Sequence, residues 1–227
     1  MINLQLEGII FLCIKLKIIK KLIHIILYMK HNAFHKANGW IEVICGPMFA
    51  GKSEELLRRI NRFKYADISY IIFKPMTDSR TKNKSESRDG RCFDAIEIKT
   101  SQEIIDYLNK QKEEGKYYDA IAIDEVQFFD DNIGEICNTL ANNGYIVYAA
   151  GLDLNFKGEP FTSIGNLLVY ADYVTKLKAI CTICGCEATH TQRLINGEPA
   201  SINDPLIQIG DNESYEARCR THHEVKK

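Results

Sequence analysis

The sequence has no excess of positive charge. Its 29 Lys and Arg residues are balanced by 30 Asp and Glu residues, so the formal net charge is -1. A dedicated nucleic-acid binder usually carries a clear basic surface. The charge balance therefore argues against that class of protein, and we expect no nucleic-acid partner.

The sequence also lacks a long hydrophobic run that is free of charge. The most apolar stretch, residues 8–28, has four lysines in its middle. Central lysines are costly in a bilayer, and a secretory signal would place its charges first and end in small residues. We therefore expect neither a membrane-spanning helix nor a secretory signal here, and no membrane contact.

Two explanations of that stretch stay open. Its basic, apolar character suits a helix lying on a membrane surface. Alternatively, Met29 is the native start, because a polar segment follows Met29 and leads into the first apolar strand. We favour Met29 and expect residues 1–38 to be an N-terminal extension outside the folded domains.

The eight cysteines are not spaced as in a disulfide framework. Four stand singly, and four crowd into the last quarter of the chain. This uneven spacing predicts a reducing, cytoplasmic compartment and one local metal site. The candidate metal ligands form two pairs with the same spacing, Cys181 with Cys184 and Cys219 with His222.

Three thiolates and one imidazole suit a tetrahedral zinc site, and a closed set of four ligands indicates a structural role. Cys186 could replace Cys184 in this set. His223 could likewise replace His222. Zinc would stabilise a segment that has too little apolar core of its own, so we expect a small zinc-binding domain over residues 176–227.

Short apolar runs alternate with helical patterns between residues 39 and 175. The strand candidates are 41–45, 70–73, 95–98, 120–123 and 145–150, and the helix candidates are 54–64, 101–110 and 132–142. Apolar strands that alternate with helices indicate an α/β domain with a mainly parallel sheet covered on both faces. Ser101 is expected to cap the second helix, and residues 76–91 to form a mobile polar loop.

A phosphate-binding motif follows the first strand candidate. Residues 46–53 read GPMFAGKS, which fits G-x-x-x-x-G-K-[ST]. The glycines let backbone N–H groups converge on a phosphate at the start of the next helix. Lys52 would reach the β- and γ-phosphates, and Ser53 would bind Mg²⁺. The predicted phosphate-binding residues are Gly46, Pro47, Met48, Phe49, Ala50, Gly51, Lys52 and Ser53.

An acidic pair, Asp124 and Glu125, follows the apolar run at 120–123. The carboxyl ends of parallel strands meet at one edge of a sheet, so this pair should lie beside the phosphate loop. Asp124 could then hold the Mg²⁺ shell, and Glu125 could accept a proton from an attacking hydroxyl. A solvated turn is the plain structural alternative, and ATP-driven motors carry the same pair.

Six blocks of the sequence resemble type II thymidine kinases. In order they read GPMFAGKSEEL, IAIDEVQFF, AAGLDLNFKGEPF, TKLKAICTICG, HTQRL and YEARCRTHH. The resemblance covers about residues 39–223 and leaves out the N-terminal extension. It implies a RecA-like P-loop domain, a small zinc domain with a lasso-like loop over the nucleoside, and a homotetramer.

The resemblance also implies an activity, the ATP-dependent transfer of the γ-phosphate to the 5′-hydroxyl of thymidine or deoxyuridine. The product would be dTMP in nucleotide salvage, with Mg²⁺ bound alongside ATP and feedback inhibition by dTTP. Glu125 resembles the general base, and backbone groups of residues 202–215 would bind the base edge. The implied substrate-binding residues are Met48, Arg88, Asp89, Phe128, Leu152, Phe161, Thr191 and Tyr215.

Some features depart from this resemblance or admit a plainer explanation. Ordinary core packing is the alternative for the aromatic residues Phe128, Phe161 and Tyr215. His222 stands where many relatives carry Cys, which preserves a zinc site. Ala50 stands where Ser is frequent, and we expect little effect because that side chain is not needed in the cradle.

Three other classes of protein share part of the pattern. A DNA-dependent ATPase or helicase would share the phosphate loop and the acidic pair, but it normally needs a second motor domain and a basic channel. A zinc-finger module needs no phosphate loop. A membrane-associated ATPase would give residues 8–28 a purpose. A thymidine kinase accounts for the most motifs, so that is the function we expect.

Overall fold

The computed structural model describes residues 39–76, 85–86, 92–206 and 213–227. The expectations about Met29 and residues 1–38, and most of the polar loop at 76–91, lie outside the described residues. Within the described ranges, no helix has both the length and the apolar character that a bilayer crossing requires.

Six strands form one sheet in the order β5-β2-β6-β7-β1-β8. Every pairing between neighbours in this sheet is parallel. The parallel sheet predicted from the apolar runs is therefore confirmed, and the carboxyl ends of all six strands meet at one edge. The strands are β1 (Trp40–Gly46), β2 (Tyr70–Pro75), β5 (Ile96–Ile98), β6 (Ala120–Ile123), β7 (Ile146–Leu152) and β8 (Tyr173–Lys176).

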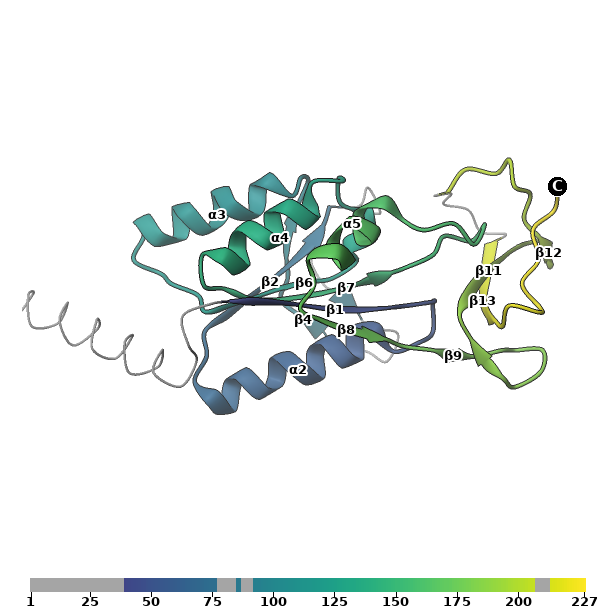
Figure 1. The fold of residues 1–227 in the computed structure, drawn as a ribbon, viewed down its shortest axis with the longest axis horizontal. Helices are drawn as coiled ribbons and strands as arrows, with labels where there is room; N and C mark the ends of the chain where they lie inside the picture. The colour runs from purple at the N-terminus through teal and green to yellow at the C-terminus, as the bar shows by residue number, and fades with distance from the viewer. Residues whose placement is uncertain (1–38, 77–84, 87–91, 207–212) are drawn as a thin grey trace, which may run out of the picture. The chain divides into compact units, whose positions relative to one another are not determined.

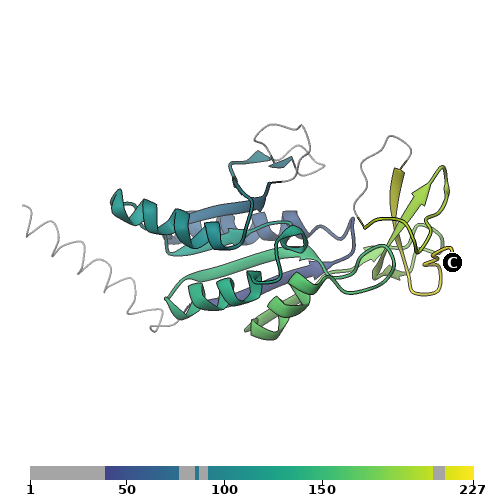
Figure 2. The same ribbon diagram turned by 90° about the horizontal axis from the view of Figure 1, so that it is seen from above.

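Helices cover both faces of this sheet, as expected from strands that are apolar on both sides. Figure 1 shows α3, α4 and α5 on one face and α2 on the other. The helices are α2 (Lys52–Ala66), α3 (Gln102–Glu113), α4 (Ile133–Asn142) and α5 (Thr162–Tyr170). Figure 2 shows the same layers from above.

The alternation of side chains along each strand explains why two cores form. In β1, Ile41 and Val43 belong to the larger core, which includes buried residues of α3, α4 and α5. Ile44 points to the other face and packs with Leu56 and Ile60 of α2. Each such buried side chain contributes about 1.5–3 kcal/mol relative to exposure.

Ser101 precedes α3 but does not cap it. Its backbone is already helical, with φ -61° and ψ -32°, and its side chain makes no capping hydrogen bond. The Ser101 hydroxyl instead donates to Asp130 Oδ1 at 2.6 Å, and its N–H donates to Asp130 Oδ2 at 2.7 Å. The predicted side-chain cap is wrong, because a cap needs an extended backbone at that position.

Shorter strands follow the six-stranded sheet. β9 and β10 form an antiparallel pair, and β11 pairs antiparallel with both β12 and β13. Their bounds are β9 (Ala179–Ile180), β10 (Glu187–Ala188), β11 (His190–Ile195), β12 (Glu198–Pro199) and β13 (Glu213–Arg218). A further hairpin joins β3 (Ser85–Glu86) to β4 (Cys92–Phe93), and a 3-10 turn, η1, spans Val126–Phe128.

A small apolar cluster lies at β9, β10 and β13. Its buried members are Ala179, Cys181, Ala188 and Ala217. Side chains of this size bury little apolar area, so they contribute little stability. This part of the fold therefore needs another source of stability.

Candidate active site and metal centre

The phosphate loop connects β1 to α2 through unusual backbone conformations. Gly46, Phe49 and Gly51 have φ angles of 145°, 66° and 76°. A Cβ added at Gly46 would lie 2.4 Å from the carbonyl oxygen of Leu177, so a larger residue cannot fit there. The glycine thus allows the loop to approach the chain that follows β8.

Lys52 lies inside the curl of this loop. Its Nζ donates a hydrogen bond to the Pro47 carbonyl at 2.8 Å. Burial lowers the pKa of Lys52 below its usual value, while the negative charges of Glu125, Asp124 and Asp153 oppose that shift. A cation with so little water around it is well placed to contact a phosphate oxygen.

Asp124 lies next to the loop, as the sequence predicted. Ser53 Oγ donates to Asp124 Oδ1 at 3.3 Å, although β7 separates the strands that precede them. Burial, and after it the negative charge of Glu125, raise the pKa of Asp124 to about 7. A hydroxyl and a carboxylate are ligands that Mg²⁺ accepts, and a cation would offset the cost of the buried charge, so Ser53 and Asp124 fit a Mg²⁺ site.

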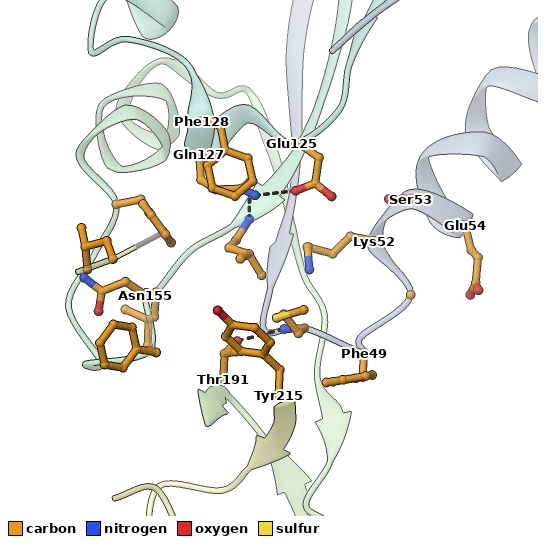
Figure 3. A pocket seen from close by; sticks show the side chains of 17 residues that line it. Phe49, Lys52, Ser53, Glu54, Glu125, Gln127, Phe128, Asn155, Thr191 and Tyr215 are labelled. Atoms are coloured by element: carbon orange, nitrogen blue, oxygen red, sulfur yellow. Dashed lines mark hydrogen bonds between the residues drawn. The ribbon is translucent and has the colours of Figure 1, made fainter. Parts of the chain in front are cut away.

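Glu125 adopts a left-handed conformation with φ 53° and ψ 41°. This turn sends the side chains of two consecutive acids in different directions. Asp124 is buried against Ser53, whereas Glu125 is exposed and lines the cavity. Figure 3 shows Glu125, Lys52 and Tyr215 around the same space.

That cavity has a volume of about 440 Å³, which is in the range of small-ligand sites. Every described residue that the resemblance implied for the substrate lines it: Met48, Phe128, Leu152, Phe161, Thr191 and Tyr215. Phe49, Gly51, Lys52, Ser53 and Glu125 line it as well. Arg88 and Asp89 lie outside the described residues, as does part of the segment 202–215.

Other lining residues were missed from the sequence. They are Glu54, Gln127, Leu154, Asn155 and Phe156, whereas Leu206, which also lines the cavity, falls in the segment 202–215 that was expected over the nucleoside. Gln127, Leu154, Asn155 and Phe156 fall within the blocks IAIDEVQFF and AAGLDLNFKGEPF. Membership of those blocks was the available signal, because no residue spacing predicts side-chain direction after a strand ends.

The phosphate loop also contacts the smaller strands. Met48 donates its backbone N–H to Thr191 Oγ1 at 3.0 Å, and Thr191 is 3% exposed in β11. Ala50 packs against the small apolar cluster that contains Cys181. One loop is therefore shared between the phosphate site and the segment that carries the Cys and His pairs.

Cys181, Cys184, Cys219 and His222 form one cluster, with all four ligand atoms within 4.8 Å of one another. Cys184 Sγ lies 3.8 Å from Cys219 Sγ, and Cys181 Sγ lies 3.8 Å from His222 Nδ1. Zn–S bonds of about 2.3 Å separate tetrahedral thiolates by about 3.8 Å, so these residues fit zinc.

The two alternative ligands are directed elsewhere or stand outside the cluster. His223 Nε2 lies 2.8 Å from the Phe156 carbonyl oxygen, and the His223 ring stacks on His190 with centroids 4.8 Å apart. Cys186 is exposed and is not among the four clustered residues. The geometry therefore favours the set with Cys184 and His222.

Comparison with known proteins identifies the family. The thymidine kinase family model matches residues 39–223. The thymidine kinase of Ureaplasma parvum serovar 3 is 52% identical over 198 residues, which is 86% of this chain and 87% of that protein. The thymidine kinase of Mycoplasmoides gallisepticum is 51% identical over 197 residues, 86% of each chain. This chain belongs to the thymidine kinase family.

Proposed function

We propose that the chain transfers the γ-phosphate of ATP to the 5′-hydroxyl of thymidine, and of deoxyuridine, giving dTMP. The main observation in support of this proposal is that one cavity is lined both by the phosphate loop and by aromatic side chains. Lys52 and Ser53 bring the phosphate loop to one side, and Phe128, Phe161 and Tyr215 bring aromatic rings to the other. Glu125 lines the same cavity.

The aromatic and apolar wall is our candidate for the nucleobase slot. Sites for bases are mostly apolar, with a few polar groups that fix orientation. Met48 and Thr191, joined by their hydrogen bond, would flank the thymine methyl group. Leu152 would add an apolar contact, and backbone groups of residues 202–215 would bind the base edge.

Proton transfer and positioning would account for most of the rate. Glu125 accepts the 5′-hydroxyl proton as that oxygen attacks the γ-phosphate in line. Lys52 places its charge on the phosphates, and Arg88 and Asp89 are further candidates near them. Ser53 and Asp124 would hold Mg²⁺, which neutralises charge on the β- and γ-phosphates when it is bound.

The Cys181 cluster is proposed as a structural zinc site. All four ligands come from the protein, so no position is open for catalysis. The small apolar cluster beside Cys181 supports this role, because it supplies little stability by itself. The RecA-like description, the homotetramer and feedback inhibition by dTTP remain proposals that rest on the family resemblance.

One assay tests the proposed reaction against the motor alternative. ADP formation is measured with thymidine, deoxycytidine or single-stranded DNA added separately. We expect thymidine to stimulate ADP release with matching formation of dTMP, and deoxycytidine to have little effect. Stimulation by DNA alone would overturn the proposal in favour of a DNA-dependent ATPase.

A further inference from the structure

Gln127 is a buried polar residue two positions after Glu125. It lies in η1, is only 5% exposed, and contributes to the lining of the cavity. A buried amide is costly unless its oxygen and nitrogen both find partners. The partners of Gln127 therefore indicate what this side chain does.

Both ends of the Gln127 amide are hydrogen-bonded. Its Oε1 accepts the backbone N–H of Leu152 at 2.9 Å, and its Nε2 donates to Glu125 Oε2 (Figure 3). A backbone N–H can only donate, so Leu152 fixes which end of the amide is oxygen. The nitrogen must then face the Glu125 carboxylate. The end of β7 thus sets the orientation of a donor to Glu125.

The backbone of β7 at Gly151 leaves room for the Gln127 amide. A Cβ added at Gly151 would lie 2.7 Å from Gln127 Oε1 and 3.2 Å from the backbone nitrogen of Val126. Any larger residue at Gly151 would push the Gln127 amide out of place. Gly151 itself does not line the cavity. The amide therefore occupies a space that the last residues of β7 leave open.

We propose that Gln127 is a positioning residue for phosphoryl transfer. It holds one oxygen of the Glu125 carboxylate and leaves the other directed at the reacting hydroxyl. This inference rests on the proposed role of Glu125 as the base. Without the amide, the exposed Glu125 side chain would sample several rotamers, and misplacement by about 1 Å can cost about 100-fold in rate.

The first test is a comparison of two substitutions at Gln127. Gln127→Met keeps the length and removes both hydrogen bonds. Gln127→Glu keeps an acceptor for the Leu152 N–H but presents an oxygen to Glu125. We expect kcat to fall by about 10- to 100-fold in both variants, with the KM values for thymidine and ATP within about threefold of wild type.

A second variant displaces the Gln127 amide through a substitution at Gly151, which lies against it. Gly151→Ala changes no residue that lines the cavity but displaces the Gln127 amide, so kcat should fall in the same direction with KM little changed. Gln111→Met is the matched control, since Gln111 is another buried glutamine, 7% exposed in α3 and away from the cavity. Its kcat should stay at the wild-type value. If Gln127→Met fails to fold, Gln127→Glu and Gly151→Ala decide the test.

The outcomes separate this inference from the proposed base. If Glu125→Gln loses turnover and Gln127→Met adds no further loss in that background, the two residues act as one unit, as proposed. Full kcat in the Gln127 variants, together with an inactive Glu125→Gln, would refute the positioning role alone. A raised thymidine KM with unchanged kcat would make Gln127 a substrate contact instead. Near-normal turnover of Glu125→Gln would refute the base itself.

Discussion

Glu125 combines an exposed side chain with a left-handed backbone at the end of β6. This conformation costs a non-glycine residue about 1–2 kcal/mol. Hydrogen bonds from the Glu125 N–H to Asp124 Oδ1 and from the Phe128 N–H to the Glu125 carbonyl hold it, and it separates two neighbouring acids, one turned to Ser53 and one to the cavity. The sequence Asp124-Glu125 predicted both roles, but no sequence rule predicts the turn that makes them compatible.

Substitution of Glu125 tests its role as the base. Glu125→Gln keeps the shape and the acceptor for Gln127 but removes the basic group. We expect kcat to fall by about 100- to 10,000-fold while ATP affinity stays near wild type. Turnover by a coupled ADP assay and binding of a non-hydrolysable ATP analogue measure the two quantities. Near-normal turnover would rule Glu125 out.

Substitution of Ser101 tests a hydrogen bond that stabilises the fold away from the active site, the one from the Ser101 hydroxyl to Asp130. Partial burial would raise the pKa of Asp130, but hydrogen bonds from Ser101 and Asn132 hold it below its usual value. Ser101→Ala removes one of these bonds, so the free energy of unfolding should fall by about 1–2 kcal/mol at pH 7. Urea unfolding measures this difference.

The same substitution has a predictable dependence on pH. A carboxyl whose folded pKa is lowered stabilises the fold above its unfolded pKa of about 3.9, and that stability is lost as the pH falls through the folded pKa. The gap between wild type and Ser101→Ala should therefore shrink below about pH 4. Ser69→Ala is the control, because the exposed Ser69 makes similar bonds to Asp119 and should cost less. A gap that stays constant down to pH 3 would contradict this account.

At the scale of elements, the contact between the phosphate loop and β11 joins the two proposed substrate sites. Thr191→Val removes the acceptor of the Met48 N–H while keeping the shape of the side chain. We expect the KM values for both thymidine and ATP to rise by about tenfold, since an unsatisfied N–H costs about 1–3 kcal/mol. Thr191→Ser keeps the hydroxyl and should restore the ATP KM. A rise confined to thymidine would show that the contact does not link the sites.

The Cys and His cluster leads to a separate prediction for the short strands β9, β10 and β13. Removal of zinc by a chelator should disorder β9, β10 and β13 and raise the thymidine KM, while the six-stranded sheet keeps its far-UV circular dichroism. Metal content and thymidine affinity are measured on the same sample. Unchanged thymidine affinity in fully zinc-free protein would contradict the prediction.

Single substitutions around the cluster distinguish its ligands. Cys184→Ser and His222→Ala should each lower zinc content. Cys186→Ser should keep the full content, because Cys186 stands outside the cluster. Zinc loss on changing Cys186 or His223, with Cys184 and His222 dispensable, would reassign the site.

The sequence predicted elements well where burial follows a simple period. β6 is apolar along its whole length, and its predicted bounds are confirmed. β11 was missed because His190 to Arg193 are polar yet buried, and each makes a hydrogen bond to a partner that a sequence does not reveal. The turn from β11 to β12 did carry a signal, since Asn196 and Gly197 both have positive φ, as the Asn-Gly hairpin pattern predicts.

For the whole molecule, the order of motifs was enough to predict the family and most of the cavity wall. The phosphate loop, the acidic pair and the Cys and His pairs each carry chemistry that needs particular residue types. The sequence did not predict how these motifs are arranged relative to one another in space. Gln127 is an example, because its proposed role depends on where β7 ends, about 25 residues away in the chain.

The place of β1 in the sheet has a consequence for synthesis of the protein. Among the strands that the structure describes, β1 pairs with β7 and β8 alone, and β7 begins about 100 residues later in the chain. At translation rates of about 5–20 residues per second, the nascent β1 must wait roughly 5–20 s for a partner. During that interval both backbone edges of β1 stay unpaired, so this enzyme should depend on chaperones until the ribosome has delivered β7 and β8. A nascent chain stalled after Gly144 should show no amide protection in β1, whereas a longer one in which Leu177 has left the ribosome should show it.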